Sequence, residues 1–189
     1  MVEDGISGTI PDWSRETPIR FWHPSRQLLR AIRRYRYWRD RGRIWRWVAQ
    51  IYKFHHLFWG IVTSADIDLN CNIAGGLLIP HPNGIVIHPE ARIGPNCLIF
   101  QQVTIGAGGN KPGLPTIQGH VDIGAGAKIL GGVVVGKHSR IGANAVVVHD
   151  VPAYATAVGI PARNISGEHR IVGPDQPEPS LSSELTTRR

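Results

Sequence analysis

The chain has 189 residues, of which 42% are apolar and 19% charged, a composition typical of one globular domain with an appendage. Its formal net charge of +7 belongs to the first third: residues 1–60 hold twelve Lys and Arg against five Asp and Glu, whereas residues 61–189 hold nine of each kind. No apolar run reaches the roughly 18–20 residues that span a bilayer, and the acidic start around Glu3, Asp4 and Pro11 is unlike a signal peptide. We therefore expect a cytoplasmic protein.

Two helices are predicted in the N-terminal third, after an extended lead-in at residues 1–24 that lacks periodicity. From Ser25 one helical face is apolar. Its stripe consists of Leu28, Leu29, Ile32 and Tyr35. After a short polar break, a second helix is predicted from Ile44 to Trp59, where Gly60 offers a stop.

Residues 26–59 combine many arginines with aromatic rings, and all six Trp of the chain precede residue 61. As a nucleic-acid surface the segment lacks a recognised reading motif, so no nucleic-acid partner is expected. As a helical cap, its apolar stripe packs on the rest of the protein or on a neighbouring subunit while the arginines stay solvated. As a peripheral membrane element, its arginines meet anionic headgroups and its rings lie at the interface. The cap and the membrane contact can hold together.

Aliphatic residues recur every six positions through the middle of the chain. The series is Ile87, Ile93, Ile99, Ile105, Lys111, Ile117, Ile123, Ile129, Val135, Ile141 and Val147, in which only Lys111 is not aliphatic. A helix repeats at about 3.6 residues and a strand at about 2.0, so neither alone explains the period. The pattern predicts short strands joined by tight turns. A β-sandwich would instead show turn signals every 8–12 residues or so.

We interpret the period as a triangular parallel β-helix with three six-residue sides in each coil. Its inward aliphatic side chains stack about 4.8 Å apart, and glycine lets the backbone turn at the corners. The section is too narrow for large rings, which agrees with Phe100 and Tyr154 being the only Phe, Trp or Tyr after residue 60. The predicted fold class is mainly β, a parallel β-helix preceded by a short α-helical segment.

Two interruptions break the period. Ile79 and Ile87 are eight residues apart, so the frame slips by two across residues 80–84, and residues 107–115 are too polar and kinked to continue a coil. The second interruption is predicted to be a loop thrown out from the prism, where functional residues tend to lie. The predicted units are the basic aromatic helical segment 1–60, the β-helix 61–167 and a flexible Pro/Ser/Glu-rich tail 168–189.

Four segments of the repeat region form an ordered set: residues 81–87 (HPNGIVI), 102–106 (QVTIG), 123–131 (IGAGAKILG) and 159–163 (GIPAR). Together they resemble the serine acetyltransferase family of hexapeptide-repeat acyltransferases, closest to its short forms that act on polysaccharide precursors. The resemblance covers residues 61–167. It implies a left-handed β-helix, a homotrimer, and acetyl-CoA as co-substrate in a groove between neighbouring prisms.

The resemblance places the catalytic histidine on His81, within the frame slip, and its orienting carboxylate on Asp66, fifteen residues upstream. A hydroxyl is a poor nucleophile until a base takes its proton, and neutral imidazole, with a reference pKa of about 6.5, suits that task near neutral pH. A carboxylate that accepts from the other ring nitrogen fixes the tautomer and stabilises the imidazolium. The alternative for His81 is a turn histidine between two prolines.

The resemblance also implies a set of mostly small residues in contact with acetyl-CoA. They are Gly106, Ala125, Lys128, Ala143, Gly159 and Arg163. Neither Cys71 nor Cys97 has metal-ligand spacing, and no pair of histidines in the repeat has it either. We predict two small buried cysteines and no bound metal.

The sequence departs from the family where the acceptor binds. Pro80 replaces an acidic residue before the histidine, and Gly113 and Leu114 replace an Arg-His pair in the extruded loop. Those family side chains pair with the charged groups of serine, so their absence favours a neutral hydroxyl acceptor. We predict an acetyl-CoA-dependent O-acetyltransferase acting on a sugar hydroxyl of a surface polysaccharide or glycan precursor. The alternatives are a serine O-acetyltransferase of cysteine biosynthesis and a non-catalytic β-helix scaffold, against which the spacing of Asp66 and His81 counts.

Overall fold

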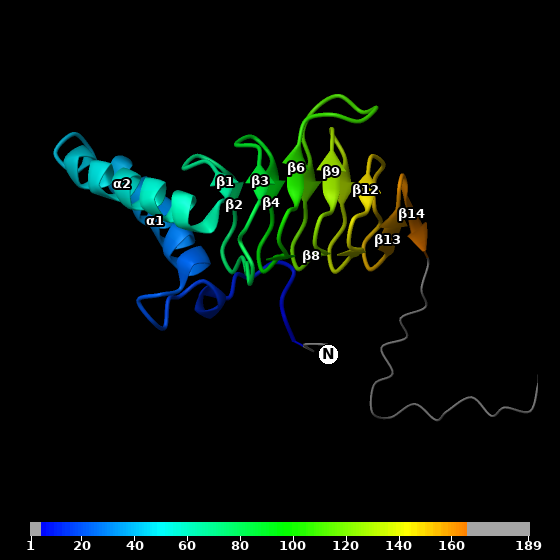
Figure 1. Ribbon diagram of the computed structural model, residues 1–189, viewed down its shortest axis with the longest axis horizontal. Coiled ribbons are helices and arrows are strands. Elements are labelled where there is room, and N and C mark those ends of the chain that lie inside the picture. Colours follow the sequence, from blue (N-terminus) through cyan, green and yellow to red (C-terminus); the bar gives the residue numbers. More distant parts are fainter. Residues whose placement is uncertain (1–4, 166–189) are drawn as a thin grey trace, which may run out of the picture.

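The structure is a computed structural model that describes residues 5–165 (Figure 1). Two helices stand at one end of a long β-helix, and the described chain finishes at the other end. The predicted tail at residues 168–189 lies outside the described residues.

The β-helix consists of strands only two to four residues long. They are β1 (Asp66–Ile67), β2 (Asn72–Ile73), β3 (Val86–Ile87), β4 (Arg92–Ile93), β5 (Leu98–Ile99), β6 (Thr104–Gly106), β7 (Thr116–Ile117), β8 (Asp122–Ile123), β9 (Lys128–Leu130), β10 (Val134–Val135), β11 (Arg140–Ile141), β12 (Val146–Val147), β13 (Thr156–Gly159) and β14 (Ala162–Ile165). The first sheet has the order β1-β3-β6-β9-β12, the second β10-β7-β4-β2 and the third β14-β13-β11-β8-β5. Among the strands of residues 5–165, only β13 and β14 pair antiparallel, so the predicted parallel β-helix is confirmed.

Aliphatic side chains stack inside the prism in register from coil to coil. In the first sheet the buried column is Ile67, Ile87, Ile105, Ile129 and Val147. The residue before each of these points outward, because side chains alternate along a strand. The corners are tight enough to demand glycine: a Cβ on Gly124 would lie 2.6 Å from the backbone nitrogen of Ala143.

Both predicted interruptions of the period are present. Residues 80–84 form a longer corner between buried Ile79 and β3. The chain leaves the prism after β6, returns at β7, and forms between them the loop that rises above the β-helix in Figure 1. The base of this loop packs closely on the coil of β10, since a Cβ on Gly132 would lie 2.3 Å from the carbonyl oxygen of Pro112.

The N-terminal region holds a 3-10 turn, η1 (Trp13–Arg15), and two helices, α1 (Pro24–Arg39) and α2 (Arg46–Thr63). The predicted end of this helix at Trp59 is four residues too early, since α2 continues through Gly60 to Thr63, and its predicted start at Ile44 is two residues early. The helix ends where Ser64 adopts the left-handed conformation with φ 50°. A left-handed residue after the last turn closes a helix, and here Ser takes the place that Gly usually fills.

The apolar stripe of α1 packs on the first coil of the β-helix. Leu28, Leu29 and Ile32 are buried in the same apolar cluster as Ile67 and Leu77. An arginine of this helix also binds the coil: Arg36 donates hydrogen bonds to the carbonyl oxygens of Leu69 and Cys71 in the first coil. The helical segment therefore caps the open end of the prism, which would otherwise expose its core.

The lead-in is held along the β-helix by one buried asparagine. The side-chain amide of Asn96 donates to the carbonyl oxygens of Ser7 and Ile10, each at 2.7 Å, and its oxygen accepts from the backbone N–H of Asp12 at 2.7 Å. Asn96 is buried and left-handed, with φ 60°. Its contacts reach residues more than 80 positions away, so the sequence pattern around the lead-in did not reveal them.

Cys71 and Cys97 are buried and unpaired by any disulfide, as predicted. Burial raises the pKa of the Cys71 thiol to about 11 and that of Cys97 to about 12. Within residues 5–165, no helix is long and apolar enough to cross a membrane, and no cluster of three or more His, Cys, Asp or Glu side chains could hold a metal ion.

Candidate active site

His81 lies in the corner at residues 80–84, between the third and first sheets. Its side chain is exposed, and its ring centroid is 6.4 Å from that of Phe100 in the next coil. Two backbone hydrogen bonds tie this corner to the start of β1: Gly84 N–H donates to the Ser64 carbonyl at 2.9 Å, and Asp66 N–H donates to the Ile85 carbonyl at 2.8 Å. The frame slip thus carries His81 beside the segment that carries Asp66.

Asp66 is the outward residue of β1, and its carboxylate is exposed. In the described part of the chain, no hydrogen bond or ion pair joins it to His81. The structure therefore places the two residues on adjacent segments of one corner but does not show them as a bonded pair. Their catalytic partnership stays a prediction.

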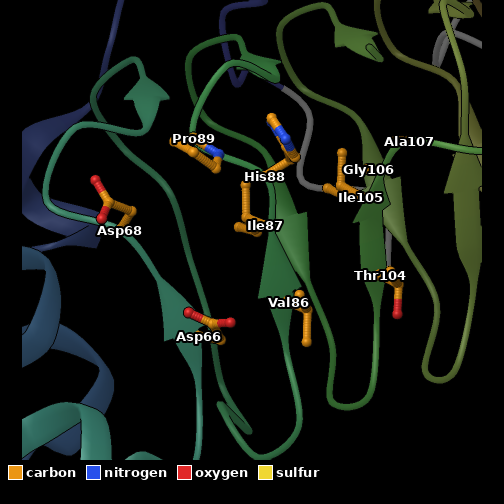
Figure 2. Close-up of a pocket in the computed structure, with 10 residues that line it drawn as sticks. All are labelled: Asp66, Asp68, Val86, Ile87, His88, Pro89, Thr104, Ile105, Gly106 and Ala107. Carbon is orange, nitrogen blue, oxygen red and sulfur yellow. The ribbon is translucent and has the colours of Figure 1, made fainter. Parts of the chain in front are cut away.

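A cavity of about 390 Å³ opens on the outer face of β1, β3 and β6 (Figure 2). Its floor is the row of outward residues Asp66, Val86 and Thr104, which the strand pairing sets side by side. Its wall is the next corner, with Asp68, His88, Pro89, Gly106 and Ala107. In Figure 2 the Asp66 side chain points into the space between β1 and β3. The cavity contains Asp66 and the base of the extruded loop, but His81 is not among its lining residues.

His88 is the imidazole that lines this cavity. Its Nδ1 accepts a hydrogen bond from the backbone N–H of Glu90 at 3.2 Å, which in the neutral ring leaves the proton on Nε2. The cavity therefore offers two carboxylates, Asp66 and Asp68, together with an imidazole donor and the Thr104 hydroxyl. The chemistry of this set suits a small polar molecule with at least one cationic or hydrogen-bond-donating group.

The six residues predicted to contact acetyl-CoA fall in three places. Ala125 and Ala143 lie at the corner between the third and first sheets in successive coils, where the Ala125 carbonyl accepts from the backbone N–H of Asn144 at 2.8 Å, and Lys128 follows this corner as the first residue of β9. Lys128 Nζ donates to the Gln102 carbonyl at 2.6 Å along the same corner.

The other three cofactor candidates lie elsewhere. Gly106 is buried at the end of β6 and lines the cavity. Gly159 and Arg163 are exposed in the terminal β13–β14 hairpin, where Gly159 pairs with Ala162 and Arg163 pairs with Val158. The structure thus brings only the three corner residues into one continuous edge.

The residues that depart from the family also have defined places. Pro80 is exposed in the His81 corner. Gly113 and Leu114 lie in the extruded loop, where a Cβ on Gly113 would be 3.4 Å from Gly132. None of these three residues lines the cavity beside Asp66.

Sequence reasoning missed Asp68, His88 and Thr104 as members of a shared cavity. A signal was available for one of them: Thr104 lies eighteen residues after Val86, which is one coil of the period, so the two outward side chains must be neighbours. Asp66 precedes Val86 by twenty residues because the frame slip adds two. Counting outward positions through the slip would have assembled the floor of the cavity.

No family model matches the chain. Among curated proteins, the chain is similar to the serine acetyltransferase of Synechococcus elongatus, with 43% identity over 107 residues that cover 56% of this chain and 44% of that protein. It is also similar to the serine acetyltransferase of Mycobacterium tuberculosis, with 37% identity over 124 residues that cover 65% of this chain and 51% of that protein. The chain spans about half the length of the curated relatives it matches.

Comparison with solved structures also finds serine acetyltransferases. The chain is similar to the serine acetyltransferase of Brucella abortus in complex with coenzyme A, with TM-score 0.64, 32% sequence identity and coverage of 76% of this chain and 56% of that one. It is similar to soybean serine acetyltransferase complexed with serine, with TM-score 0.63, 35% identity and coverage of 76% and 58%. The predicted resemblance to the serine acetyltransferase family is confirmed.

Proposed function

We propose that this chain, on the strength of its confirmed resemblance to the serine acetyltransferases, is an acetyl-CoA-dependent O-acetyltransferase whose acceptor is L-serine. The observation that carries the proposal is the similarity of 76% of the chain, at 32% and 35% identity, to solved serine acetyltransferases bound to coenzyme A and to serine. The same relatives do not support the sugar acceptor predicted from the sequence, since they are named for serine. The serine alternative fits better.

In the proposed reaction His81 is the general base and Asp66 orients it. The imidazole takes the proton of the serine hydroxyl as its oxygen attacks the thioester carbonyl carbon of acetyl-CoA. The tetrahedral intermediate then collapses, the carbon–sulfur bond breaks, and the leaving thiolate of CoA takes the proton back from the imidazolium. Asp66 need only swing toward the adjacent corner to stabilise the imidazolium, because its carboxylate is exposed and has no other bonded partner in the described chain.

The cavity beside Asp66 supports an acceptor that carries an ammonium group. Asp66 and Asp68 supply negative charge, and the Nε2–H of His88 is available to a carboxylate. One feature of the sequence favours the second candidate, a neutral sugar hydroxyl: the resemblance aligns Pro80, Gly113 and Leu114 with the family's charged side chains that pair with serine. An assay must therefore decide between L-serine and a sugar as the acceptor.

A homotrimer belongs to the same proposal and rests on the family resemblance. His81, Asp66 and the corner residue Lys128 all lie toward the outside of a single prism. A neighbouring prism would shield them from water and complete a groove for the co-substrate. The mass of the full chain in solution, measured by light scattering, would show a trimer if this is right and a monomer if it is not.

The catalytic test is CoA release from acetyl-CoA by the full chain, measured as free thiol. Buried Cys71 and Cys97, whose pKa values are raised, should contribute little background. We expect His81→Ala to lower kcat by at least about 10²-fold and Asp66→Asn by a smaller factor. His149→Ala, another exposed histidine, is the matched control and should retain wild-type rate. Near-normal turnover by a folded His81→Ala protein would refute the assignment.

The acceptor test uses the same assay with L-serine and with a panel of sugars. Saturable CoA release with serine supports the proposal, and Asp68→Asn should then raise the KM for serine more than it lowers kcat. Saturable turnover with a sugar and none with serine would refute serine as the acceptor but would still support acetyl transfer from acetyl-CoA to a hydroxyl. Turnover with neither, in a correctly assembled protein, would count for the scaffold alternative.

A further inference from the structure

The outward face of α2 is apolar over its whole length. Its stripe consists of Trp47, Ile51, Phe54, Phe58 and Ile61, which are between 52% and 80% exposed. These residues follow the spacing i, i+4, i+7, i+11 and i+14, so they lie in one row about 21 Å long. Leu57 and Val62 widen the row and are exposed as well. We call these seven residues the α2 stripe.

The α2 stripe is not the face by which the helix packs on the protein. The buried residues of α2 are Ala49, Trp59 and Thr63, which lie on the opposite side of the helix. A surface helix ordinarily turns its polar side to water, and a helix that is apolar on both sides requires a second cover. A contiguous row of exposed apolar side chains on one face marks an interaction surface.

The charge around the stripe is of one sign. Arg43, Arg46 and Lys53 are exposed on or just before α2, and the chain contains no Asp or Glu between Arg41 and Ala65. The arginines that the fold itself uses are different ones, since Arg33 is paired with Glu16 and Arg36 bonds to the first coil. The basic groups beside the stripe therefore have no carboxylate of the helix to neutralise them.

Aromatic rings gather where α2 begins. Trp38 and Trp45 stack with centroids 4.8 Å apart across the α1–α2 connection, and Arg41 lies 4.1 Å over the ring of Tyr37. Trp and Tyr favour the boundary between headgroups and acyl chains, and arginine stems can lie along apolar surface while the guanidinium reaches phosphate. This end of the helix thus has the composition of an interfacial element.

We propose that the α2 stripe lies on an anionic lipid surface, with the apolar row in the acyl boundary and Arg43, Arg46 and Lys53 against the headgroup phosphates. A second copy of the same face would bring like charges together without a compensating carboxylate, whereas anionic lipid supplies the opposite charge. The contact is peripheral, because no helix in residues 5–165 can cross a bilayer. The sequence-based expectation gave this contact to residues 26–59 as a whole, whereas the proposal confines it to α2 and the residues just before it, because the stripe of α1 is buried on the β-helix.

Vesicle sedimentation of the full chain tests this proposal independently of catalysis. Binding is expected to vesicles of phosphatidylcholine with phosphatidylglycerol and to be weak with phosphatidylcholine alone. It should also weaken between about 0.1 M and about 1 M salt, as the Debye length falls from about 10 Å to about 3 Å. Failure of the wild-type protein to bind the mixed vesicles at low salt would refute the proposal.

Two variants separate the apolar and the charged parts of the contact. Phe54→Ser with Phe58→Ser should lower the partition coefficient at least about tenfold, since the burial of two aromatic rings in the acyl boundary is lost. Arg43→Gln with Arg46→Gln should lower it about fivefold for each charge removed. The matched control is Ile10→Ser with Ile165→Ser, which removes two exposed apolar side chains away from α2 and should bind like wild type.

The competing occupant is a second copy of the chain. Circular dichroism must first show that the Phe54, Phe58 variant is folded, and Trp47→Ser serves in its place if it is not. If the wild-type assembly in lipid-free buffer loses subunits when the stripe is made polar, and vesicles do not bind, then the stripe is a protein interface and the proposal is wrong. Unchanged mass together with lost vesicle binding supports it.

Discussion

The β-helix buries aliphatic side chains that recur every six residues, whereas the N-terminal region buries Trp59, a few aliphatic residues of α1 and a network of charged hydrogen bonds. In the first, each residue packs on its equivalent one coil away. In the second, contacts join residues far apart in the sequence, such as Asn96 with Ser7. One region follows a local rule and the other depends on single polar contacts.

The comparison also explains where the charge of the chain lies. The β-helix, residues 61–167, holds six Lys and Arg against five Asp and Glu, so it adds a net charge of only +1, whereas residues 1–60 carry +7. The N-terminal region uses some of its arginines to tie the cap to the first coil and leaves others free around α2. Some basic side chains of the N-terminal region thus bind the first coil, and in our proposal others contact lipid headgroups.

The largest expected effect is at the contact that joins the two regions. Glu16, with a side chain only 7% exposed, accepts from Arg33 Nε at 3.0 Å and Nη2 at 2.8 Å, and from the backbone N–H of Leu77 at 2.9 Å. Glu16→Ala leaves Arg33 without its carboxylate and a buried N–H without an acceptor. We expect the free energy of unfolding in urea to fall by about 3 kcal/mol.

The control for this prediction is the exposed ion pair of Arg39 and Asp40, whose Nε to Oδ1 distance is 2.9 Å. Asp40→Ala should leave the unfolding midpoint unchanged, because exposed pairs contribute little. Both proteins must be compared at one protein concentration, since assembly shifts apparent stability. Equal losses in the two variants would mean that the Glu16 contact does not join the regions as described.

The middle effect tests the inward and outward alternation of the prism. Val135 is fully buried and Val134 is 38% exposed in the same strand. Val135→Ala should lower the free energy of unfolding by about 2 kcal/mol, from the lost burial of two carbons and the cavity they leave. Val134→Ala should change it by less than about 0.5 kcal/mol. The same urea titration measures both, and similar values for the pair would contradict the register.

The sequence predicted the β-helix well because its rule is local and repeated. The period, the frame slip at residues 80–84 and the loop after β6 could all be read from residue spacing. The path of the lead-in and the Glu16–Arg33 contact could not, because each depends on which partner lies nearby in space. For α2, periodicity indicated a helix but could not say which face would be buried.

The site was predictable in part for the same reason. Asp66 and His81 came from a resemblance, and their adjacent segments follow from the slip. The cavity needed coordinates, since Asp68 and His88 lie at a corner whose direction no period specifies. The direction of a corner side chain depends on its local backbone conformation and on its neighbours, whereas the side chain of an inward aliphatic residue always enters the core of the β-helix.

The smallest expected effect is a pH dependence confined to the helical region. Burial, and to a lesser extent the charge of Arg30, lowers the pKa of His55. Trp59 Nε1–H donates to His55 Nε2 at 2.8 Å, which requires a neutral ring. Because the unfolded chain takes up this proton more readily, the stabilisation is complete above the unfolded pKa of about 6.5 and declines as the pH falls through it.

His55→Gln tests this dependence, because the Gln carbonyl can still accept from Trp59 but does not titrate. We expect the loss of unfolding free energy between about pH 7.5 and about pH 5.5 to be smaller in His55→Gln than in the wild type. His149→Gln, at an exposed position of the β-helix, should behave as the wild type does. If His149→Gln reduced this loss of unfolding free energy and His55→Gln did not, the pH dependence would come from the β-helix and the His55 assignment would be wrong.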